Sequence, residues 1–566
     1  MAEKSEKALT LVTERFDKAK DFRQPREDRW NSYYKLYRNY IEDKEYPWRS
    51  KLFIPYTFSN IETVIPRIIR AIFNEFDDVD VNQPVEKLLR YARSRMDLYT
   101  KLYSALKDVL IYGTFILKPF WRYETRKRYE LRPFANVFGR EVGSKKTKID
   151  ATFYDDPDCA VVDPYDFYVD PRAKDIDDAL FCVHRIETTQ EEIKRNKANI
   201  YKNLDKLEEM NSYPGDDTVR ERTDTTKDYS PRDYVDSFTK KVELLEYWEN
   251  DRVITLANRQ IVLRDEENPF WHLQKPFIKG VVCPVPHEFW GIGIVEMTES
   301  LQHELNDIRN MRMDNVNIII NRMWVVERSA DVEMKDPMSY PSAVHVTNDI
   351  NGIKMLETQD VTSNAYMEED RVKFDMQTAT GIYDYSKGLA PARKETATAV
   401  LSLQGEANKR FEGMIELLLR GAMRKLNEYN ISLYQQFIPG MESQMKEFTI
   451  AGDEMPTIIK PEDIAGIYNY EMSGTPVEGL SMLARQQYMV QLYMPVLQSG
   501  VVDPITWTKE LLKVYKFKDL DKIIRPPAPV ASPFTPAQEG AQPAPSLQTG
   551  ATEQGNIPLT MGGENI

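Results

Sequence analysis

The stretch that decides the fold of this chain is IVEMTESLQHELNDIRNMRMDNVNIIINR, residues 294–322. Large apolar side chains recur in it every three or four positions, which is the spacing of one face of a helix. They are Ile294, Met297, Leu301, Leu305, Ile308, Met311 and Ile318. Such a helix is roughly 40 Å long at about 1.5 Å per residue. The opposite face holds several asparagines, which are mediocre helix formers, so we expect packing, mainly against neighbouring chains, to hold this helix.

The residues that follow alternate between strand-like and helical patterns. Short β-leaning runs separated by Pro and Asn-Gly occupy 323–361. A second helix is predicted to begin near Thr362 or Ser363 and to end by Gly381. A loop with two glycines and a proline, 381–395, then leads to a third long helix that ends near Gly440.

The segments on both sides of this centre predict an α+β fold that is mainly helical. Pro25 is interpreted as the start of an N-terminal helix. Helices are predicted at 26–43, 58–75, 85–112, 190–212, 479–498 and 503–516, and β-structure at 113–131, 151–186, 241–249, 252–264 and 276–283. Residues 213–236 are predicted to be a mobile surface loop, and the Pro-, Ala-, Gln- and Gly-rich residues after Arg525 a disordered tail.

The composition is that of a folded protein with several domains. The chain has 566 residues, of which 42% are apolar. Its 75 basic and 89 acidic residues give a net charge of −14, which argues against a dominant basic surface for nucleic acid. Three distant cysteines predict neither disulfides nor a thiolate metal site. The charged N-terminus and the lack of a long apolar run predict no signal peptide and no membrane span.

Motifs for catalysis are weak, so no catalytic residue, metal ligand or cofactor is predicted. The nearest match to a phosphate-binding loop, GREVGSKKT at 139–147, has its second glycine one place early and is interpreted as a basic hairpin tip. The five histidines form no metal-binding pair. Two acidic clusters, around Asp155-Asp156 and Asp175 to Asp178, fit either metal ligands of a nuclease or, more simply, solvated turns.

One segment of this acidic chain, Lys118 to Lys148, is locally basic. Arginines and lysines alternate in it with Trp121, Tyr123 and Tyr129. Contact with phosphate is one interpretation. The other is the charged outer face that hairpins commonly carry.

Four motifs occur in a fixed order along the chain. They are Trp48-Arg-Ser-Lys-Leu-Phe-Ile-Pro55, Tyr165-Asp-Phe-Tyr-Val-Asp-Pro171, Phe289-Trp-Gly-Ile-Gly293 leading into Leu301-Gln-His-Glu-Leu-Asn306, and the 381–400 loop with Glu395-Thr-Ala-Thr398. In this order, over roughly residues 26–440, they resemble the portal (head-to-tail connector) proteins of tailed bacteriophages, of a podovirus-like kind. The resemblance implies a subunit of a ring, usually dodecameric, with wing, stem, clip and crown regions around a DNA channel.

The resemblance also implies a division of the chain. It assigns 1–285 to the wing, 286–322 and 362–380 to two long stem helices, 323–361 to a small α/β clip, 381–395 to a tunnel loop, 396–440 to a long wing helix, 441–524 to a helical crown and 525–566 to the tail. The stem-packing residues are then Ile294, Met297, Leu301, Leu305 and Ile308. In the tunnel loop, Lys387, Arg393 and Lys394 would touch passing DNA, with Gly381 and Gly388 as hinges; these cations could instead pair with Asp384 and Glu395.

The function that the resemblance implies is structural. The chain would be made in the bacterial cytoplasm and would form, in the virion, the channel for DNA packaging and ejection at one capsid vertex. Implied partners are further copies in a ring, double-stranded DNA, the terminase motor, head-to-tail adaptor proteins and the major capsid protein. Two alternatives remain open: a metal-dependent DNA-processing enzyme that uses the acidic clusters and the basic hairpin, and another minor structural protein of the head.

Overall fold

The structure is a computed structural model of the whole chain. It describes residues 2–41, 49–75, 83–137, 140–197, 200–208, 240–320, 323–327, 353–356, 362–383, 410–441, 445–449, 456–466, 468, 482–498 and 502–515. The chain divides into two compact units, Met1–Gly479 and Leu480–Ile566. The predicted surface loop 213–236 and the predicted tail after Arg525 lie outside the described residues.

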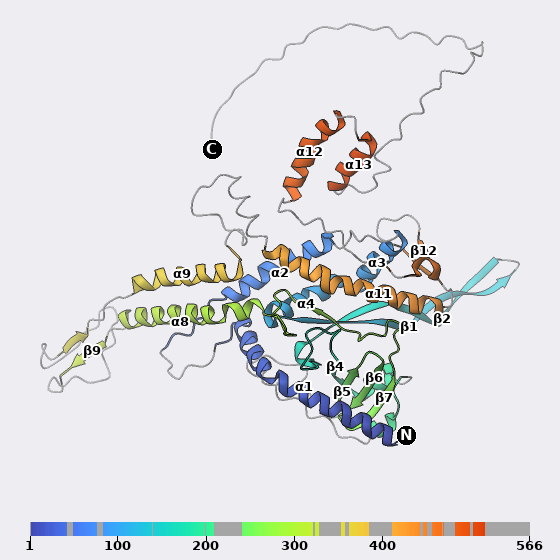
Figure 1. Cartoon of the computed structure of the whole chain (residues 1–566), viewed down its shortest axis with the longest axis horizontal. Coiled ribbons are helices and arrows are strands. Elements are labelled where there is room, and N and C mark those ends of the chain that lie inside the picture. The colour runs from blue at the N-terminus through green and yellow to red at the C-terminus, as the bar shows by residue number, and fades with distance from the viewer. Residues whose placement is uncertain are drawn as a thin grey trace, which may run out of the picture. The chain divides into compact units, whose positions relative to one another are not determined.

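The first unit contains helices and small antiparallel sheets (Figure 1), which confirms the prediction of a mixed α+β fold. Its helices are α1 (Ala2–Tyr37), α2 (Tyr56–Glu75), α3 (Gln83–Arg95), α4 (Leu98–Tyr112), α5 (Gln190–Lys197), α6 (Leu204–Glu208), α8 (Ile294–Ile320), α9 (Thr362–Thr380) and α11 (Arg424–Phe437). Its strands are β1 (Phe115–Val137), β2 (Arg140–Val162), β3 (Phe167–Val169), β4 (Cys182–Thr189), β5 (Lys241–Trp248), β6 (Arg252–Ala257), β7 (Ile261–Glu267), β8 (Ile278–Gly280), β9 (Met323–Val326), β10 (Ile353–Leu356), β11 (Lys446–Phe448) and β12 (Thr457–Ile459).

A five-stranded antiparallel sheet, in the order β3-β4-β5-β6-β7, is covered on both faces. One face packs against the first half of α1, where Val12 and Phe16 are fully buried with Tyr247 and Leu256. The other packs a second cluster that includes Ile193 of α5 and Leu207 of α6. The predicted strand at 252–264 is two strands, β6 and β7, because the chain turns at Asn258 and Arg259, which both have positive φ.

The N-terminal helix is longer than predicted. It begins at Ala2 and passes through Pro25, where the sequence had placed its start. Proline inside a helix removes a hydrogen bond and costs about 3 kcal/mol. Burial on both sides offsets that cost, since Phe16 before the proline and Trp30 after it are both 0% exposed. The prediction was wrong because tertiary packing outweighs this local signal.

The largest core joins α2, α3, α4, α11 and the start of β1. The predicted helix at 85–112 is divided into α3 and α4 at Asp97, whose φ is 50°. At the other end of α4, the chain turns at Gly113 (φ 90°), and a Cβ at this position would lie 2.0 Å from the carbonyl oxygen of Gly291. A Cβ at Gly291, just before α8, would likewise lie 2.6 Å from the carbonyl oxygen of Gly113, so the close approach of the two backbones requires glycine at both positions.

The second unit contains a pair of helices, α12 (Met482–Gln498) and α13 (Pro504–Val514), close to the two helices predicted there. The Asp503 carboxylate accepts the backbone N–H of Thr506 at 3.0 Å, as the residue before a helix commonly does. The hydroxyl groups of Tyr493 and Thr508 lie 2.9 Å apart and join the two helices.

Candidate functional site

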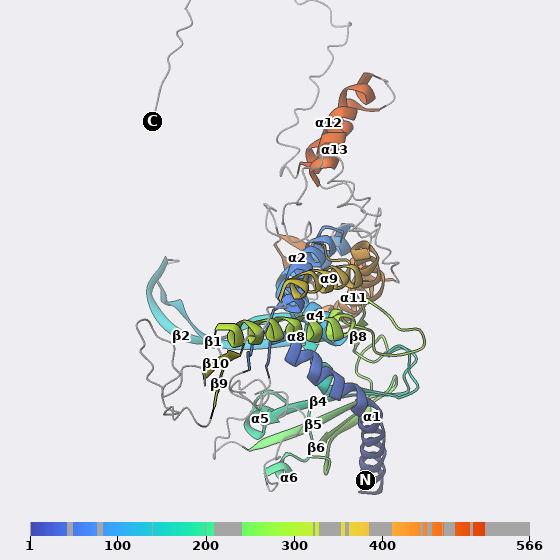
Figure 2. The same cartoon turned by 90° about the vertical axis from the view of Figure 1, so that its left-hand side faces the viewer.

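The helices α8 and α9 lie side by side and carry the short hairpin of β9 and β10 at their far end (Figure 2). Both helices were predicted, and α8 begins at the predicted residue. Leu305 of α8 is buried between them with Val372 and Met376 of α9, and Leu301 and Ile308 pack on this cluster while partly exposed. Of the other two predicted packing residues, Ile294 belongs to the main core and Met297 is half-buried. Most of the predicted clip between β9 and β10 lies outside the described residues.

A row of polar side chains on α8 binds an extended segment, residues 50–57. The row consists of Gln302, Asn306, Asn310 and Asp314, which are four residues apart and therefore share one face of the helix. Their side-chain oxygens accept the backbone N–H groups of Thr57 (3.0 Å), Ile54 (3.0 Å), Leu52 (2.8 Å) and Ser50 (2.6 Å), in that order. Alternate N–H groups of an extended chain point to one side. The helix face thus takes the place of a neighbouring strand.

Two of these side chains also donate hydrogen bonds. Gln302 Nε2 donates to the carbonyl oxygen of Ile54 at 2.8 Å, and Asn310 Nδ2 donates to that of Leu52 at 3.1 Å. Such pairing allows polar groups to be buried. The expectation that neighbouring chains hold this face was therefore wrong for Gln302, Asn306 and Asn310. They are covered by a segment of the same chain, 252 residues earlier in the case of Ile54.

A buried ion pair joins the same two helices. The Arg312 guanidinium of α8 contacts the Glu369 carboxylate of α9, with side chains only 2% and 10% exposed. Lys373, one turn further along α9, lies 2.8 Å from Glu369. The Arg312 guanidinium also lies over the ring of Tyr366 at 4.1 Å from its centre. A buried pair of this kind fixes the position of one helix along the other, because removing one partner leaves a buried charge.

Two residues meet at the end of α9: Gly381, where the predicted tunnel loop begins, and Arg410, which lies 15 residues after its predicted end. Gly381 ends the helix with φ 75°, and its N–H donates to the carbonyl oxygen of Gln377 at 2.7 Å. Arg410 donates to the carbonyl oxygen of Ala379 at 2.7 Å, so the chain returns to the point that it left. Sequence reasoning missed Arg410, because nothing local indicates this contact. The predicted loop residues Lys387, Gly388, Arg393 and Lys394 lie outside the described residues.

Both long helices expose large apolar side chains. Met311 and Ile320 on α8 and Tyr366, Met367 and Phe374 on α9 are each more than half exposed. Apolar side chains gathered on neighbouring elements are typical of surfaces that another protein covers.

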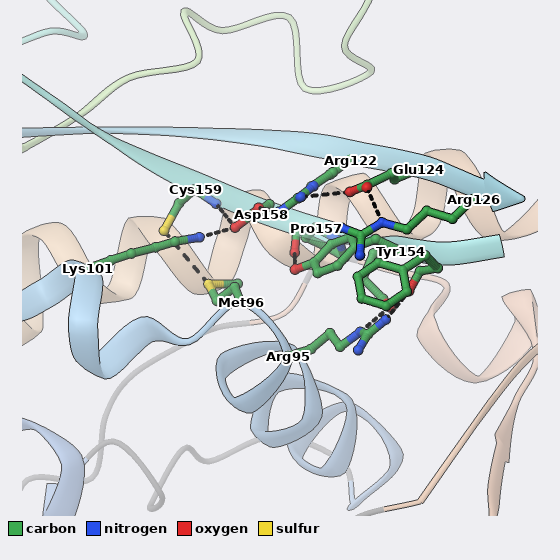
Figure 3. Close-up of polar contacts among 12 residues, drawn as sticks. Arg95, Met96, Lys101, Arg122, Glu124, Arg126, Tyr154, Pro157, Asp158 and Cys159 are labelled. Atoms are coloured by element: carbon green, nitrogen blue, oxygen red, sulfur yellow. Dashed lines mark hydrogen bonds and ion pairs between the residues drawn. The ribbon is translucent and has the colours of Figure 1, made fainter. Parts of the chain in front are cut away.

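In the first acidic cluster, Asp156 and the nearby Asp158 are paired with cations, and Asp155 accepts a hydrogen bond from Trp121 Nε1 at 2.9 Å. Asp158 contacts the ammonium of Lys101 and lies 3.2 Å from the guanidinium of Arg122 (Figure 3). Asp156 lies 2.6 Å from Lys446 Nζ, and burial raises the pKa of this carboxyl group, which the cation opposes. A carboxylate that binds an ammonium in this way stabilises the core. It leaves no cluster of open ligands for a divalent metal ion.

The second acidic cluster is arranged similarly. Asp177 lies 2.6 Å from Lys425 Nζ, and Asp175 lies 3.7 Å from Lys279 Nζ and 3.8 Å from Lys425 Nζ. Within the described part of the chain, no group of three or more His, Cys, Asp or Glu side chains could hold a metal ion. The geometry of both clusters therefore favours ion pairing over metal-dependent cleavage.

The stretch around 139–147 belongs to a hairpin. β1 and β2 pair as antiparallel strands from Ile116 and Val162 outward to Val137 and Arg140. A phosphate-binding loop joins a strand to a helix, whereas residues 140–147 belong to a strand that pairs with β1, so the interpretation as part of a hairpin is confirmed.

The family model described as phage SU10 portal protein matches residues 139–557, well over half of the chain. No curated protein matches this sequence. In the described ranges, no helix has both the length and the apolarity needed to cross a lipid bilayer.

Proposed function

The chain belongs to the phage SU10 portal protein family, and on that premise we propose that α8 and α9 are the stem helices that surround the DNA channel. Members of the family are structural, non-enzymatic proteins of the virion that form a ring for the passage of DNA at the capsid portal. Membership of this family therefore decides against both alternative functions, the DNA-processing enzyme and the minor head protein.

The observation that carries the proposal is the arrangement of α8 and α9. Two long helices, joined at one end through β9 and β10, are held in register by the Arg312–Glu369 pair and by residues 50–57. Their exposed apolar residues, among them Met311 and Phe374, fit packing against the same helices of the next subunit. In this proposal 323–361 is the clip, 1–285 and 396–440 are the wing, and 441–524 is the crown.

The loop at 381–395 is proposed to face DNA. The loop begins at the end of α9, where Arg410, 15 residues beyond the predicted end of the loop, binds the carbonyl oxygen of Ala379. Lys387, Arg393 and Lys394 would contact phosphate, with Gly381 and Gly388 as hinges. Few cations suit this role, since each phosphate ion pair strengthens binding and would slow translocation.

The ring is proposed to contain about a dozen copies and to dock the terminase motor during packaging and adaptor proteins afterwards, in contact with the major capsid protein. Native mass spectrometry with negative-stain microscopy tests the ring itself. A closed ring with a central hole is expected. A protein that stays monomeric at high concentration and with capsid protein present would contradict the proposal.

The loop is tested by deleting 386–394. We expect rings to form as in the wild type, and DNA packaging into capsids to be lost. A deletion of the same length within 213–236 is the matched control, and packaging should survive it. Packaging at the wild-type level after the 386–394 deletion would remove the loop from the proposal and leave the ring unaffected.

A further inference from the structure

The hairpin of β1 and β2 continues far beyond its support. The third strand of its sheet, β8, pairs only with Phe115 to Leu117. At Trp121 the hairpin still packs on α11, stacking on Phe437 with 4.8 Å between ring centres. Beyond that point Figure 1 shows the two strands extending past α11. A two-stranded hairpin alone is at best marginally stable in water, so the outer part gains stability from any partner that covers it.

One face of the outer hairpin combines tyrosines with lysines. Side chains alternate between the two faces of a strand, and the register places Tyr129 opposite Lys148 and Lys127 opposite Asp150. The tyrosine–lysine face, as we call it, consists of Tyr123, Lys127, Tyr129, Lys146 and Lys148, all of which are exposed. Tyr129 is 59% exposed, and the ammonium of Lys146 lies 4.3 Å from its ring centre.

On the opposite face of the outer hairpin, arginines are paired within the hairpin itself, which makes that face less suited to bind a partner. There Glu124 lies 2.7 Å from Arg122 and 2.6 Å from Arg126, so these two arginines are already paired with an acidic side chain. The Arg126 guanidinium also covers the ring of Phe153 at 3.7 Å from its centre. The tyrosine–lysine face exposes both its aromatic rings and its lysine side chains to solvent.

The charge of the hairpin is opposite to that of the chain. Residues 122–150 contain nine basic and four acidic residues, whereas the whole chain has a net charge of −14. The remainder of the chain is thus strongly acidic, and a second copy of this chain offers the hairpin a partner of opposite net charge. In a closed ring every copy can offer its hairpin to the next copy, because the contact is head-to-tail.

We propose that the tyrosine–lysine face docks on the acidic surface of a second copy of this chain, the adjacent subunit of the ring. The proposal rests on the ring of the proposed function. Protein is a better occupant than double-stranded DNA, because exposed tyrosine rings bury well in a protein interface.

A photo-crosslinking experiment on the full chain tests the proposal. A benzophenone amino acid replaces Tyr129 in one variant and Trp271, which is 63% exposed outside the hairpin, in the control. After irradiation of nuclease-treated rings, we expect the Tyr129 variant to give a covalent product of two chains in several-fold greater yield than the control. Peptide mapping should place the second attachment site on the same sequence.

The possible failures are distinct. Rings that form but give no product of two chains above the control would overturn the inference and leave the proposed function standing. A Tyr129 product that contains DNA, in rings not treated with nuclease, would also overturn it in favour of a DNA-binding hairpin. A chain that forms no ring would contradict both.

Charge reversal provides a second measurement. The triple variant Lys127→Glu, Lys146→Glu, Lys148→Glu should raise the protein concentration needed for half-maximal ring formation roughly tenfold or more, because it places like charges against each other. The matched triple change to arginine should leave that concentration within about twofold, since it preserves the charge. Equal ring formation by all three proteins would overturn the inference.

Discussion

Asn310 makes both hydrogen bonds to Leu52 that an adjacent β-strand would make: its Oδ1 accepts the backbone N–H at 2.8 Å, and its Nδ2 donates to the carbonyl oxygen at 3.1 Å. A single helical side chain thus substitutes for a peptide group. Gln302 also accepts one backbone hydrogen bond and donates another, but to two different residues: it accepts from Thr57 and donates to Ile54. The side chains of α8 therefore bind the extended segment 50–57 as a neighbouring β-strand would.

Replacing Asn310 by alanine is expected to lower the free energy of unfolding by about 1–2 kcal/mol, because two backbone groups lose their partner. The higher helix propensity of alanine recovers only a few tenths of a kcal/mol. Urea denaturation of the purified chain measures the change. Glu304→Ala, at an exposed position of the same helix, is the control and should change the stability by less than about 0.5 kcal/mol. Equal stability of both variants would show that the pairing contributes nothing.

The Arg312–Glu369 pair is suited to a double-mutant cycle. Arg312→Met alone should destabilise the protein by about 1–3 kcal/mol, since the buried Glu369 carboxylate loses its arginine and keeps Lys373. Adding Glu369→Gln should recover part of that loss, because the charge is then removed. Thermal or urea unfolding of the four proteins gives the coupling free energy. Strictly additive effects would contradict a direct interaction.

His272 should make stability depend on pH. Burial lowers the pKa of its imidazole to about 4, and Nδ1 accepts the backbone N–H of Gln274 at 3.0 Å, which requires the neutral ring. The unfolded chain binds a proton near pH 6.5. The stabilisation by neutral His272 is thus complete above pH 6.5 and is lost as the pH falls toward 4, by up to about 1.4 kcal/mol per pH unit.

The measurement for His272 is a series of urea unfolding curves between pH 7.5 and 5, for the wild type and for His272→Phe. His272 stacks on Phe270 with 5.2 Å between ring centres, and phenylalanine keeps such a ring but cannot take up a proton. The difference in stability between the two proteins should shift in favour of the variant as the pH falls. Parallel curves for the two proteins would contradict a lowered pKa.

Gly113→Ala should be far more damaging than an ordinary glycine substitution. Its Cβ would lie 2.0 Å from the carbonyl oxygen of Gly291, which belongs to the backbone and cannot rotate away, and φ is 90°. We expect little folded protein at 37 °C. Gly413→Ala, where a Cβ meets nothing within 4 Å, is the control and should fold normally. Normal folding of Gly113→Ala would mean that the two backbones can separate.

The elements that were predicted correctly are those whose signal is local. The apolar period of α8 predicted its first residue, and the strand patterns predicted the inner part of the β1–β2 hairpin, although both strands extend beyond the predicted β-structure at 113–131 and 151–186. What could not be predicted depends on contacts between distant residues. Lys446 neutralises Asp156 from 290 positions away, and α1 passes through Pro25 because a sheet formed by much later residues packs against it. The polar residues on α8 could be seen in the sequence, but the sequence did not show that the extended segment 50–57 binds them.

The polar row on α8 can pair with only a short extended segment. Four residues of helix advance about 6.0 Å and two residues of extended chain about 6.6 Å, so the two scales drift apart by roughly 0.6 Å at each step. The final step, from Ile54 to Thr57, spans three residues, because the chain has entered α2 by then. These hydrogen bonds fix the position along α8 at which α2 starts. One inserted residue between Ser50 and Ile54 would turn the N–H groups on one side of it away from α8. Insertions and deletions in this part of the chain can therefore be accommodated only outside residues 50–57.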